Sequence, residues 1–420
     1  MEMAPYFVSA LRNELGEDNF YRYFANARDG QGVVLTYSFL KSVPAGAINY
    51  YGDPNTGFRQ YTAKEKAVVN DALAIFESVA NVRFKETTGN TDLQFGQFAI
   101  PGNIAGYAGY PLYNKTTNEI VKGPNYGDVW LDSDYIAGNP HLVLHEVGHS
   151  LGLEHPFEGT FQLPAAEDNT NNTVMSYSGV WQQTLGIYDV IALQSIYGPA
   201  KRRMGDNTYV FGNDKLIWDG GGKDLITAAQ ASKAVTIDLH DGSWNFAGSK
   251  AASFLDDAKG IQVYLGNFTV IEKLIGSRFD DHLSGNQIAN TISGGKGDDR
   301  IEGSGGRDAL RGGNGADTFL FTKLSDSTAA MTGRDFISDF KHGQDDRFDL
   351  RALDADAGAN NNQAFTFVGT DKFSNQAGEL HYSDKGGDTL VTGDIDGDGT
   401  ADFSFLVNGN INLVKGDFLL

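Results

Sequence analysis

Hydrophobic residues change their spacing along the chain, and the change separates two kinds of structure. In the first half, segments 33–39, 82–86 and 92–98 are short, rich in β-branched and aromatic residues and partly alternating, which predicts strands. A helix is predicted to begin after Thr62, because Thr62 and Glu65 have the spacing of a capping box. One face of this helix collects the apolar residues Val68, Val69, Ala72, Leu73, Ile75, Phe76 and Val79. This order predicts a mixed α/β domain with a sheet backed by helices.

From Gly276 to Leu320 the pattern instead repeats every nine residues. The copies read GSRFDDHLS, GNQIANTIS, GGKGDDRIE, GSGGRDALR and GGNGADTFL. Their sixth positions are Asp281, Asn290, Asp299, Asp308 and Asp317. Their apolar eighth positions are Leu283, Ile292, Ile301, Leu310 and Phe319. Such a repeat predicts a parallel β-roll, in which glycine turns alternate with very short strands whose apolar residue points inward.

A roll of this kind has a small apolar core and rows of carboxylates that repel one another. The chain has 52 glycines and a formal net charge of -21, which argues against nucleic-acid phosphates as partners and favours bound cations. Calcium takes about six to eight oxygen ligands, from carboxylates and turn carbonyls. We therefore expect the roll to fold when calcium binds.

The transition between the two patterns predicts a domain boundary. Glycine and proline coincide near residues 197–207 with the basic run 201–203, which we interpret as a solvated linker. With 420 residues the chain can form two domains, 1–200 and 201–420, each with its own core. The chain has no cysteine and therefore neither disulfides nor thiolate metal sites. A membrane-spanning helix is excluded on length, and the N-terminus lacks the features of a Sec signal.

The segment HEVGHSLGLEHP starts at residue 145 and predicts a metal site. On a helix His145 and His149 share one face, and Gly152 lets the chain turn back so that His155 can offer a third nitrogen. Five residues fixed in the pattern HExxHxxGxxH occur by chance on the order of once in a few million starting positions. Three histidines with an open fourth position are typical of catalytic zinc.

Two neighbouring residues receive other interpretations. His141 lies one turn earlier on the same face, but as a fourth ligand it would close the position that a catalyst needs open. We therefore expect His141 to lie outside the ligand set. Glu154 is interpreted as a solvated surface residue.

Further segments resemble the serralysin family of bacterial zinc metalloproteases, which are metzincins. Met175 and Tyr177 stand in TVMSYSG, Pro156 follows the third histidine, and the nonapeptides lie downstream. Segments 126–134, 189–199 and 416–420 are also similar to the family, so the resemblance covers nearly the whole chain. It implies that 1–200 is an α/β metzincin-like zinc metalloprotease catalytic domain. It implies that 201–420 is an all-β calcium-binding β-roll with a β-sandwich-like tail and a C-terminal secretion signal.

For this family the resemblance implies an endopeptidase mechanism at one catalytic zinc ion. Zinc would polarise the scissile carbonyl and activate a water, whose proton Glu146 would take as general base and pass on to the leaving amine. Tyr177 would be a further zinc ligand that stabilises the oxyanion, and Met175 a structural base beneath the metal. An edge strand above the zinc would bind an extended substrate; it contains Ala105, Gly106, Tyr107 and Ala108.

The resemblance also implies several structural calcium ions in the second domain. One site would use Arg203, Gly205, Asn207, Asp219, Gly221 and Asp224, and a neighbouring site would use Gly222 and Glu272. In the roll the implied ligands are Gly276, Asp281, Gly294, Gly295, Gly297, Asp299, Gly303, Asp308, Gly312, Gly313, Gly315 and Asp317. Ions should lie between the first, third and fifth repeats.

Some features depart from the family pattern. Asn290 replaces aspartate and Ile288 replaces glycine, which puts a calcium site between the second and fourth repeats in doubt. Residues 394–402 have the aspartate spacing of a cation loop but Phe405 at its twelfth position, so a calcium loop and a polar hairpin turn both stay open. Residues 1–32 precede the first predicted strand, which fits a mature form or a short-range latency segment. The stretch after Tyr177 is brief, which predicts a more open groove.

The resemblance further implies a secreted, extracellular, monomeric protein. Its implied partners are protein or peptide substrates, a small proteinaceous protease inhibitor and a type I secretion machinery that reads the uncleaved C-terminal signal. We expect no nucleic-acid partner and no membrane-spanning segment.

Two other functions compete with the protease interpretation. A calcium-dependent secreted binding or adhesive protein could use such a roll beside an inactive protease domain. Decay of that domain would have cost at least one of the residues His145, Glu146, His149, His155 and Tyr177, and all are present. A zinc amidase fits the three histidines but not the turn around Met175 or the edge strand. Hydrolysis of a protein substrate distinguishes the protease from both.

Overall fold

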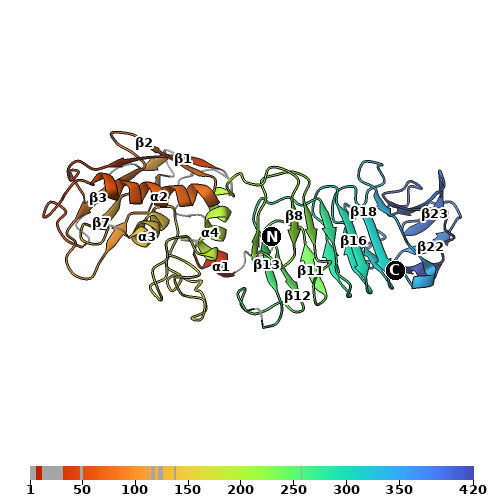
Figure 1. Cartoon of the computed structure of the whole chain (residues 1–420). Coiled ribbons are helices and arrows are strands. Elements are labelled where there is room, and N and C mark those ends of the chain that lie inside the picture. The colour runs from red at the N-terminus through yellow and green to blue at the C-terminus, as the bar shows by residue number, and fades with distance from the viewer. Residues whose placement is uncertain are drawn as a thin grey trace. The chain divides into compact units, whose positions relative to one another are not determined.

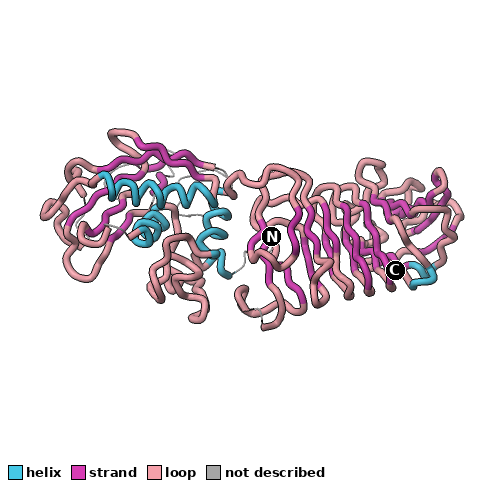
Figure 2. The backbone as a smooth tube through the Cα atoms, viewed as in Figure 1, coloured by secondary structure: helices cyan, strands magenta, loops and turns pink. Residues whose placement is uncertain are grey.

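The computed structural model describes residues 6–11, 32–47, 51–110, 112–114, 119–121, 126–136, 139–256 and 258–420. The chain forms two compact units. Unit 1 spans Met1–Arg202 with Gly266–Phe268, and unit 2 spans Arg203–Leu265 with Thr269–Leu420. Their boundary falls within the predicted segment 197–207. In Figure 2 the α-helices belong to unit 1, whereas unit 2 consists mainly of strands and loops.

Unit 1 is built on a sheet with strand order β2-β1-β3-β7-β4. The strands are β1 Val33–Phe39, β2 Val82–Glu86, β3 Leu93–Phe98, β4 Gly106–Ala108 and β7 Val129–Asp132. β4 is antiparallel to β7 and lies at the edge, and the other neighbours pair in parallel. A separate pair joins β5 Leu112–Asn114 to β6 Glu119–Val121. The three strands predicted from the sequence are confirmed, with β3 beginning one residue late.

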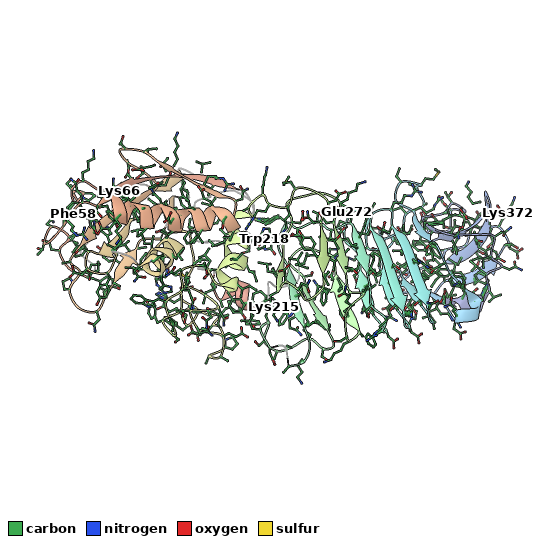
Figure 3. All side chains as sticks on the ribbon, viewed as in Figure 1. Phe58, Lys66, Lys215, Trp218, Glu272 and Lys372 are labelled. Carbon is green, nitrogen blue, oxygen red and sulfur yellow. The ribbon has the colours of Figure 1, made fainter. Side chains whose placement is uncertain are left out.

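Helix α2 of unit 1, Ala63–Val79, confirms the predicted amphipathic helix. Thr62 Oγ1 accepts the N–H of Glu65, and a Glu65 carboxylate oxygen accepts the N–H of Thr62, which is the predicted capping box. Its most buried apolar residues are Val69, Ala72, Leu73 and Phe76. Lys66, labelled in Figure 3, places its Nζ 4.6 Å from the centroid of the Phe39 ring in β1.

The other described α-helices of unit 1 are α1 Tyr6–Ser9, α3 Pro140–Ser150 and α4 Ile187–Tyr197. Helix α3 contacts α2, β4 and β7, which places it against the sheet beside the edge strand. In the described part of the chain, no helix is long and apolar enough to cross a membrane.

Unit 2 contains two long sheets whose strands stack side by side (Figure 1). One sheet has the order β22-β23-β24-β25-β20-β18-β16-β14-β10-β8. Its strands are β8 Thr208–Val210, β10 Leu225–Thr227, β14 Lys273–Ile275, β16 Thr291–Lys296, β18 Ala309–Asn314, β20 Asp335–Ile337, β22 Thr366–Gly369, β23 Glu379–Lys385, β24 Asp388–Asp394 and β25 Phe403–Val407. The other has the order β26-β21-β19-β17-β15-β11-β12-β13-β9. Its strands are β9 Leu216–Ile217, β11 Val235–Asp238, β12 Trp244–Ala247, β13 Gln262–Leu265, β15 His282–Ser284, β17 Arg300–Glu302, β19 Thr318–Leu320, β21 Arg347–Asp349 and β26 Phe418–Leu419.

Alternate nonapeptides pair in parallel and in register. Leu283 is opposite Ile301, and Ile301 is opposite Phe319, whereas Ile292 pairs with Leu310 in the other sheet. All five of these side chains are fully buried. Each short strand therefore contributes one inward apolar residue from the repeat, as the spacing predicts.

The C-terminal strands, which the resemblance implied to form a β-sandwich-like tail, continue the two sheets of the roll. Strands β22–β25 extend one long sheet beyond β20, and β26 extends the other by parallel pairing of Phe418 with Phe348. The tail is therefore continuous with the two sheets, because each added strand pairs with the exposed edge of its neighbour in the sheet. Two 3-10 turns, His342–Gln344 and Lys415–Asp417, lie in the same region.

Candidate metal centre

Helix α3 positions two of the three predicted histidine ligands. Asn139 caps the helix through its side chain and Pro140 occupies the first turn, where its missing N–H does no harm. The helix ends at Ser150, and Gly152 has φ 93°, a left-handed conformation that favours glycine. The chain turns back after this glycine, which brings His155 to the same face as His145 and His149.

The Nε2 atoms of these three histidines converge. His155 Nε2 lies 3.0 Å from His149 Nε2 and 3.3 Å from His145 Nε2. Nitrogens bound to a tetrahedral zinc at about 2.0–2.1 Å lie roughly 3.3–3.4 Å apart. The spacing therefore fits a single metal ion of this size, and the three residues form a group that could hold one.

The opposite ring nitrogens orient two of the imidazoles. His145 Nδ1 lies 2.7 Å from the Val174 carbonyl oxygen, and His149 Nδ1 lies 2.9 Å from the Leu153 carbonyl oxygen. A carbonyl can only accept, so each Nδ1 carries the hydrogen and each Nε2 presents its lone pair to the site. Burial lowers the pKa of His145 to about 4 and moves that of His149 well below its ordinary value. Both rings are therefore neutral, as metal ligation requires.

Tyr177 also lies at this group. Its hydroxyl is 2.8 Å from His155 Nε2, although the residue as a whole is 69% exposed. Burial of the hydroxyl and, next, the nearby Glu146 carboxylate raise the pKa of Tyr177 to about 12. The phenol keeps its hydrogen at neutral pH in this structure and is able to donate it.

Glu146 lies beside the histidines on α3 and is buried. Burial raises the pKa of Glu146 to about 8. Edge strand β4 runs close to this carboxylate: a Cβ added at Gly106 would lie 2.9 Å from Glu146 Oε1. Only glycine therefore leaves this carboxylate its present position.

The turn that contains Met175 packs against α3 between two of the histidines. Met175 is fully buried, and a Cβ added at Gly148 would lie 2.7 Å from its sulfur. Buried Asp189 of α4 accepts hydrogen bonds from Thr173 Oγ1 at 2.6 Å and from Val174 N at 2.8 Å. Because the Val174 carbonyl orients His145, Asp189 contributes to ligand orientation.

The roles of Asp189 and Gly148 are not predicted from the sequence. Asp189 is the first residue of the segment 189–199, which resembles the family. This resemblance is the feature of the sequence that could have indicated a role for Asp189. Gly148 occupies an unspecified position of HExxH, and its need for a small side chain appears only once Met175 packs against it.

His141 lies apart from the three convergent nitrogens, as expected. Its ring stacks on Trp181 at a centroid distance of 5.8 Å, and its Nδ1 accepts the N–H of Gln182. Trp181 itself is 54% exposed. The residues predicted to bind substrate, Ala105 and the strand 106–108, lie half-buried along the edge of the sheet.

In unit 2 the first group of predicted calcium ligands is connected by hydrogen bonds. Asp224 accepts the N–H of Asn207 at 2.8 Å, and Glu272 (labelled in Figure 3) accepts the N–H of Asp224 at 2.7 Å. Asp219 accepts the N–H of Gly221, and the Asn207 amide donates to the carbonyls of Arg203 and Gly205. The structure thus brings these residues together, with Gly222 packed against the Gly205 carbonyl.

In the roll, the predicted aspartates form a ladder. The N–H of Asp281 donates to Asp299 Oδ1, that of Asp299 to Asp317 Oδ1, and that of Asp317 to Asp346 Oδ1, at 2.9–3.0 Å. On the other side of the roll, Asn290 donates to Asp308 and Asp308 to Asp335. The glycines predicted with them lie against this ladder. A Cβ added to four of them would lie within 2.7 Å of an aspartate oxygen: Gly276, Gly294, Gly303 and Gly312. A Cβ added to four others would lie within 2.5 Å of the backbone of the adjacent turn: Gly295, Gly297, Gly313 and Gly315.

Several ladder carboxylates have an oxygen without a donor. Within the described residues, Oδ2 of Asp299, Asp308 and Asp335 is buried and has no hydrogen-bond partner. Burial and then the charges of Asp281 and Asp317 raise the pKa of Asp299 to about 8, against the backbone hydrogen bond that it accepts. Such oxygens fit a cation as their missing partner.

Asn290 behaves differently from the aspartates. Its Nδ2 donates to the Ile271 carbonyl at 3.0 Å, and Asn286 Nδ2 donates to the same oxygen at 2.9 Å. Side-chain amides thus donate to the Ile271 carbonyl oxygen where a repeat with aspartate would place a carboxylate. This is the position at which the sequence put a calcium site in doubt.

The loop after β24 holds a second acidic group. Carboxylate oxygens of Asp394, Asp396 and Asp398 lie within 4.8 Å of one another. Both oxygens of Asp394 accept backbone N–H groups of Gly397 and Gly399, and strands β24 and β25 pair on either side. The segment is therefore a hairpin, and whether it also binds calcium stays a prediction.

Comparisons with known proteins show the family to which the chain belongs. Residues 207–420 match the family model described as Peptidase M10 serralysin C terminal. The chain is 33% identical to metallopeptidase AprA of Pseudomonas marginalis, over 95% of this chain and 88% of that protein. It is 33% identical to serralysin of Proteus mirabilis, over 84% and 80% of the two chains, and 32% identical to serralysin G of Dickeya chrysanthemi, over 90% and 83%. The chain therefore belongs to the serralysin family of metalloproteases.

Proposed function

We propose that the protein is a secreted zinc-dependent endopeptidase that hydrolyses peptide bonds of protein substrates and is stabilised by calcium. The observation that carries this proposal is the convergence of three histidine Nε2 atoms, with buried Glu146 on the same helix and the Tyr177 hydroxyl 2.8 Å from His155 Nε2. His145, His149 and His155 would hold the zinc, and Tyr177 would be an exchangeable further ligand.

When bound, zinc supplies a Lewis acid that polarises the scissile carbonyl and lowers the pKa of a water. Glu146 takes the proton of the attacking water and later donates it to the leaving amine, so no covalent intermediate is needed. Tyr177 donates its hydroxyl hydrogen to the oxyanion that develops on the carbonyl oxygen.

Strand β4 binds the substrate in this proposal. It lies at the edge of the described sheet, where an extended peptide can add as a further strand. Gly106 leaves room for the carboxylate of Glu146 beside this strand. The proposed substrate strand and the proposed general base on α3 thus lie close together.

Unit 2 would bind several calcium ions through the ladder and turn residues of 203–317. The unpartnered Asp299 and Asp308 oxygens support this part of the proposal. The terminal segment, which pairs through Phe418, would act as the type I export signal while the chain is unfolded. Calcium outside the cell would then fold the exported chain.

The test is hydrolysis of casein by the wild type and by Glu146→Ala, in millimolar calcium and with zinc content measured on the same samples. We expect about 10³-fold slower cleavage by the variant with one zinc still bound. Glu86→Ala, which truncates an exposed carboxylate of β2, is the matched control and should cleave like the wild type. If folded, zinc-loaded wild type does not cleave casein, the endopeptidase proposal fails and a calcium-dependent binding function takes its place.

A further inference from the structure

One contact at the metal centre joins a predicted ligand to the chain just beyond the edge strand. The Tyr110 hydroxyl lies 3.2 Å from His149 Nδ1, and the two rings meet edge to face at 5.5 Å and 76°. The same Nδ1 lies 2.9 Å from the Leu153 carbonyl oxygen. His149 thus has two oxygen neighbours at one ring nitrogen.

The Leu153 carbonyl oxygen fixes which atom is the donor in both hydrogen bonds. It cannot donate, so the hydrogen resides on His149 Nδ1, and the Tyr110 oxygen is then a second acceptor of that hydrogen. The opposite arrangement, with Tyr110 donating to a bare Nδ1, would set the ring nitrogen against the carbonyl and protonate the nitrogen that faces His155. The geometry therefore selects the ligand-competent form of the imidazole.

Tyr110 is held at this position by the sheet. Directly after β4, Gly109 continues the pairing with the β7 side: its N–H donates to the Asp128 carbonyl at 2.9 Å, and its carbonyl accepts the N–H of Gly127 at 3.1 Å. Residue 106 at the start of β4 meets Glu146, and residue 110 beyond its end meets His149. One short segment thus contacts both the proposed general base and a proposed ligand.

We propose that Tyr110 is a positioning residue of the metal centre, which fixes the His149 ring through its hydroxyl oxygen and couples that ring to the strand that binds substrate. This inference rests on the proposed zinc-dependent function. The hydroxyl strengthens the His149–metal bond by accepting from the far side of the ring, since hydrogen bonds behind a metal-bound histidine orient it and increase its basicity.

The test compares wild type, Tyr110→Phe and Tyr135→Phe, each as the full chain in calcium. The zinc dissociation constant is measured by competition with a chelator, and the absorption spectrum is recorded after replacement of zinc by cobalt. We expect Tyr110→Phe to bind zinc about tenfold more weakly and to shift the cobalt bands, because losing a partner behind a metal ligand typically costs 10–100-fold in affinity. Its kcat should fall while KM changes less than about twofold, since the ring and the strand backbone remain.

Tyr135, 48% exposed after β7, loses the same oxygen in the control and should match the wild type in every readout. Equal zinc affinity and equal cobalt spectra for Tyr110→Phe and Tyr135→Phe would overturn the positioning role while the protease proposal stands. A wild type that binds no zinc would instead remove the proposed function itself. If Tyr110→Phe loses its fold, thermal unfolding detects this, and Tyr110→His, which keeps a ring with an acceptor nitrogen, should bind zinc more tightly than Tyr110→Leu if the inference holds.

Discussion

Two buried carboxylates, Glu65 in unit 1 and Asp299 in unit 2, behave in opposite ways. Glu65 in unit 1 is 3% exposed and accepts hydrogen bonds from Arg59, Thr62 and Gln97. Burial opposes its ionisation, but these donors outweigh that effect and lower the pKa of Glu65 to about 2. Asp299 in unit 2 is 1% exposed, keeps one oxygen without a donor and has its pKa raised to about 8.

The difference lies in where the partner of each charge comes from. Around Glu65 the chain itself supplies the donors, so this carboxylate connects separate parts of the fold. In the roll one oxygen of Asp299, Asp308 and Asp335 has no donor from the described chain, and its partner must be a cation or a proton from solution. Unit 1 should therefore be stable by itself, and unit 2 should depend on solution conditions.

Removal of calcium should give the largest difference between the two units. In calcium-free buffer that still contains zinc, we expect residues 276–349 to lose hydrogen-exchange protection while α3 keeps it. Because the folded pKa of Asp299 is raised, the stability of the calcium-free roll is greatest in acid and is lost as pH rises through about 8. The calcium-free roll should therefore be better protected at pH 5 than at pH 8. Unchanged protection on calcium removal would contradict the proposed role of the cation.

Asp189→Ala should destabilise unit 1 by about 4 kcal/mol, because buried donors of Thr173, Val174 and Gly186 lose their acceptor. Denaturant unfolding measures the change, and zinc affinity should fall with it since Val174 orients His145. Asp134→Ala, at an exposed position, serves as the control and should shift stability little. A loss below about 1 kcal/mol would show that the turn does not depend on this carboxylate.

Glu65→Gln should lower the stability of unit 1 by about 3 kcal/mol at neutral pH, from the shift of its pKa from 4.5 to about 2. A depressed pKa contributes stability above the unfolded value, and the contribution disappears as pH falls through the folded value. The difference between variant and wild type should therefore shrink between pH 4.5 and pH 2. Unfolding curves across this range check it, and a constant difference would argue for a purely steric effect.

The smallest effect should come from Asn290→Asp. The change removes the amide donor to the Ile271 carbonyl and adds a carboxylate, which should cost about 2 kcal/mol in unit 2 without calcium. Calcium should reduce this deficit, because the variant restores the repeat's sixth residue. Asn314→Asp, at an exposed position, is the matched control. A deficit that calcium leaves unchanged would mean that this turn offers no cation position even with an aspartate.

Periodic and local signals were sufficient to predict much of this molecule. Helix α2 and its capping box, the strands β1–β3 and the register of the nonapeptides follow from spacing within about ten residues. The same holds for the three histidines, since two share a helical face and one glycine returns the third.

What escaped prediction depends on contacts between distant segments. Asp189 supports a turn about fifteen residues away, and Tyr110 reaches His149 from another element. The need for glycine at positions 106 and 148 arises from side chains that pack against them in three dimensions. The continuity of the tail with the two sheets likewise follows from edge pairing that no local pattern encodes.

The aspartate ladder has a polarity. At each step the backbone of an earlier turn is held by the carboxylate of a later one, from Asp281 to Asp299, Asp317 and finally Asp346. A turn that lacks its successor leaves the buried N–H of its aspartate without an acceptor. The backbone bonds run in the opposite direction, because the N–H of Arg300 donates to the Asp281 carbonyl and that of Thr318 to the Asp299 carbonyl. Each turn therefore depends on both of its neighbours, and the two ends of the stack are the places where donors lack acceptors.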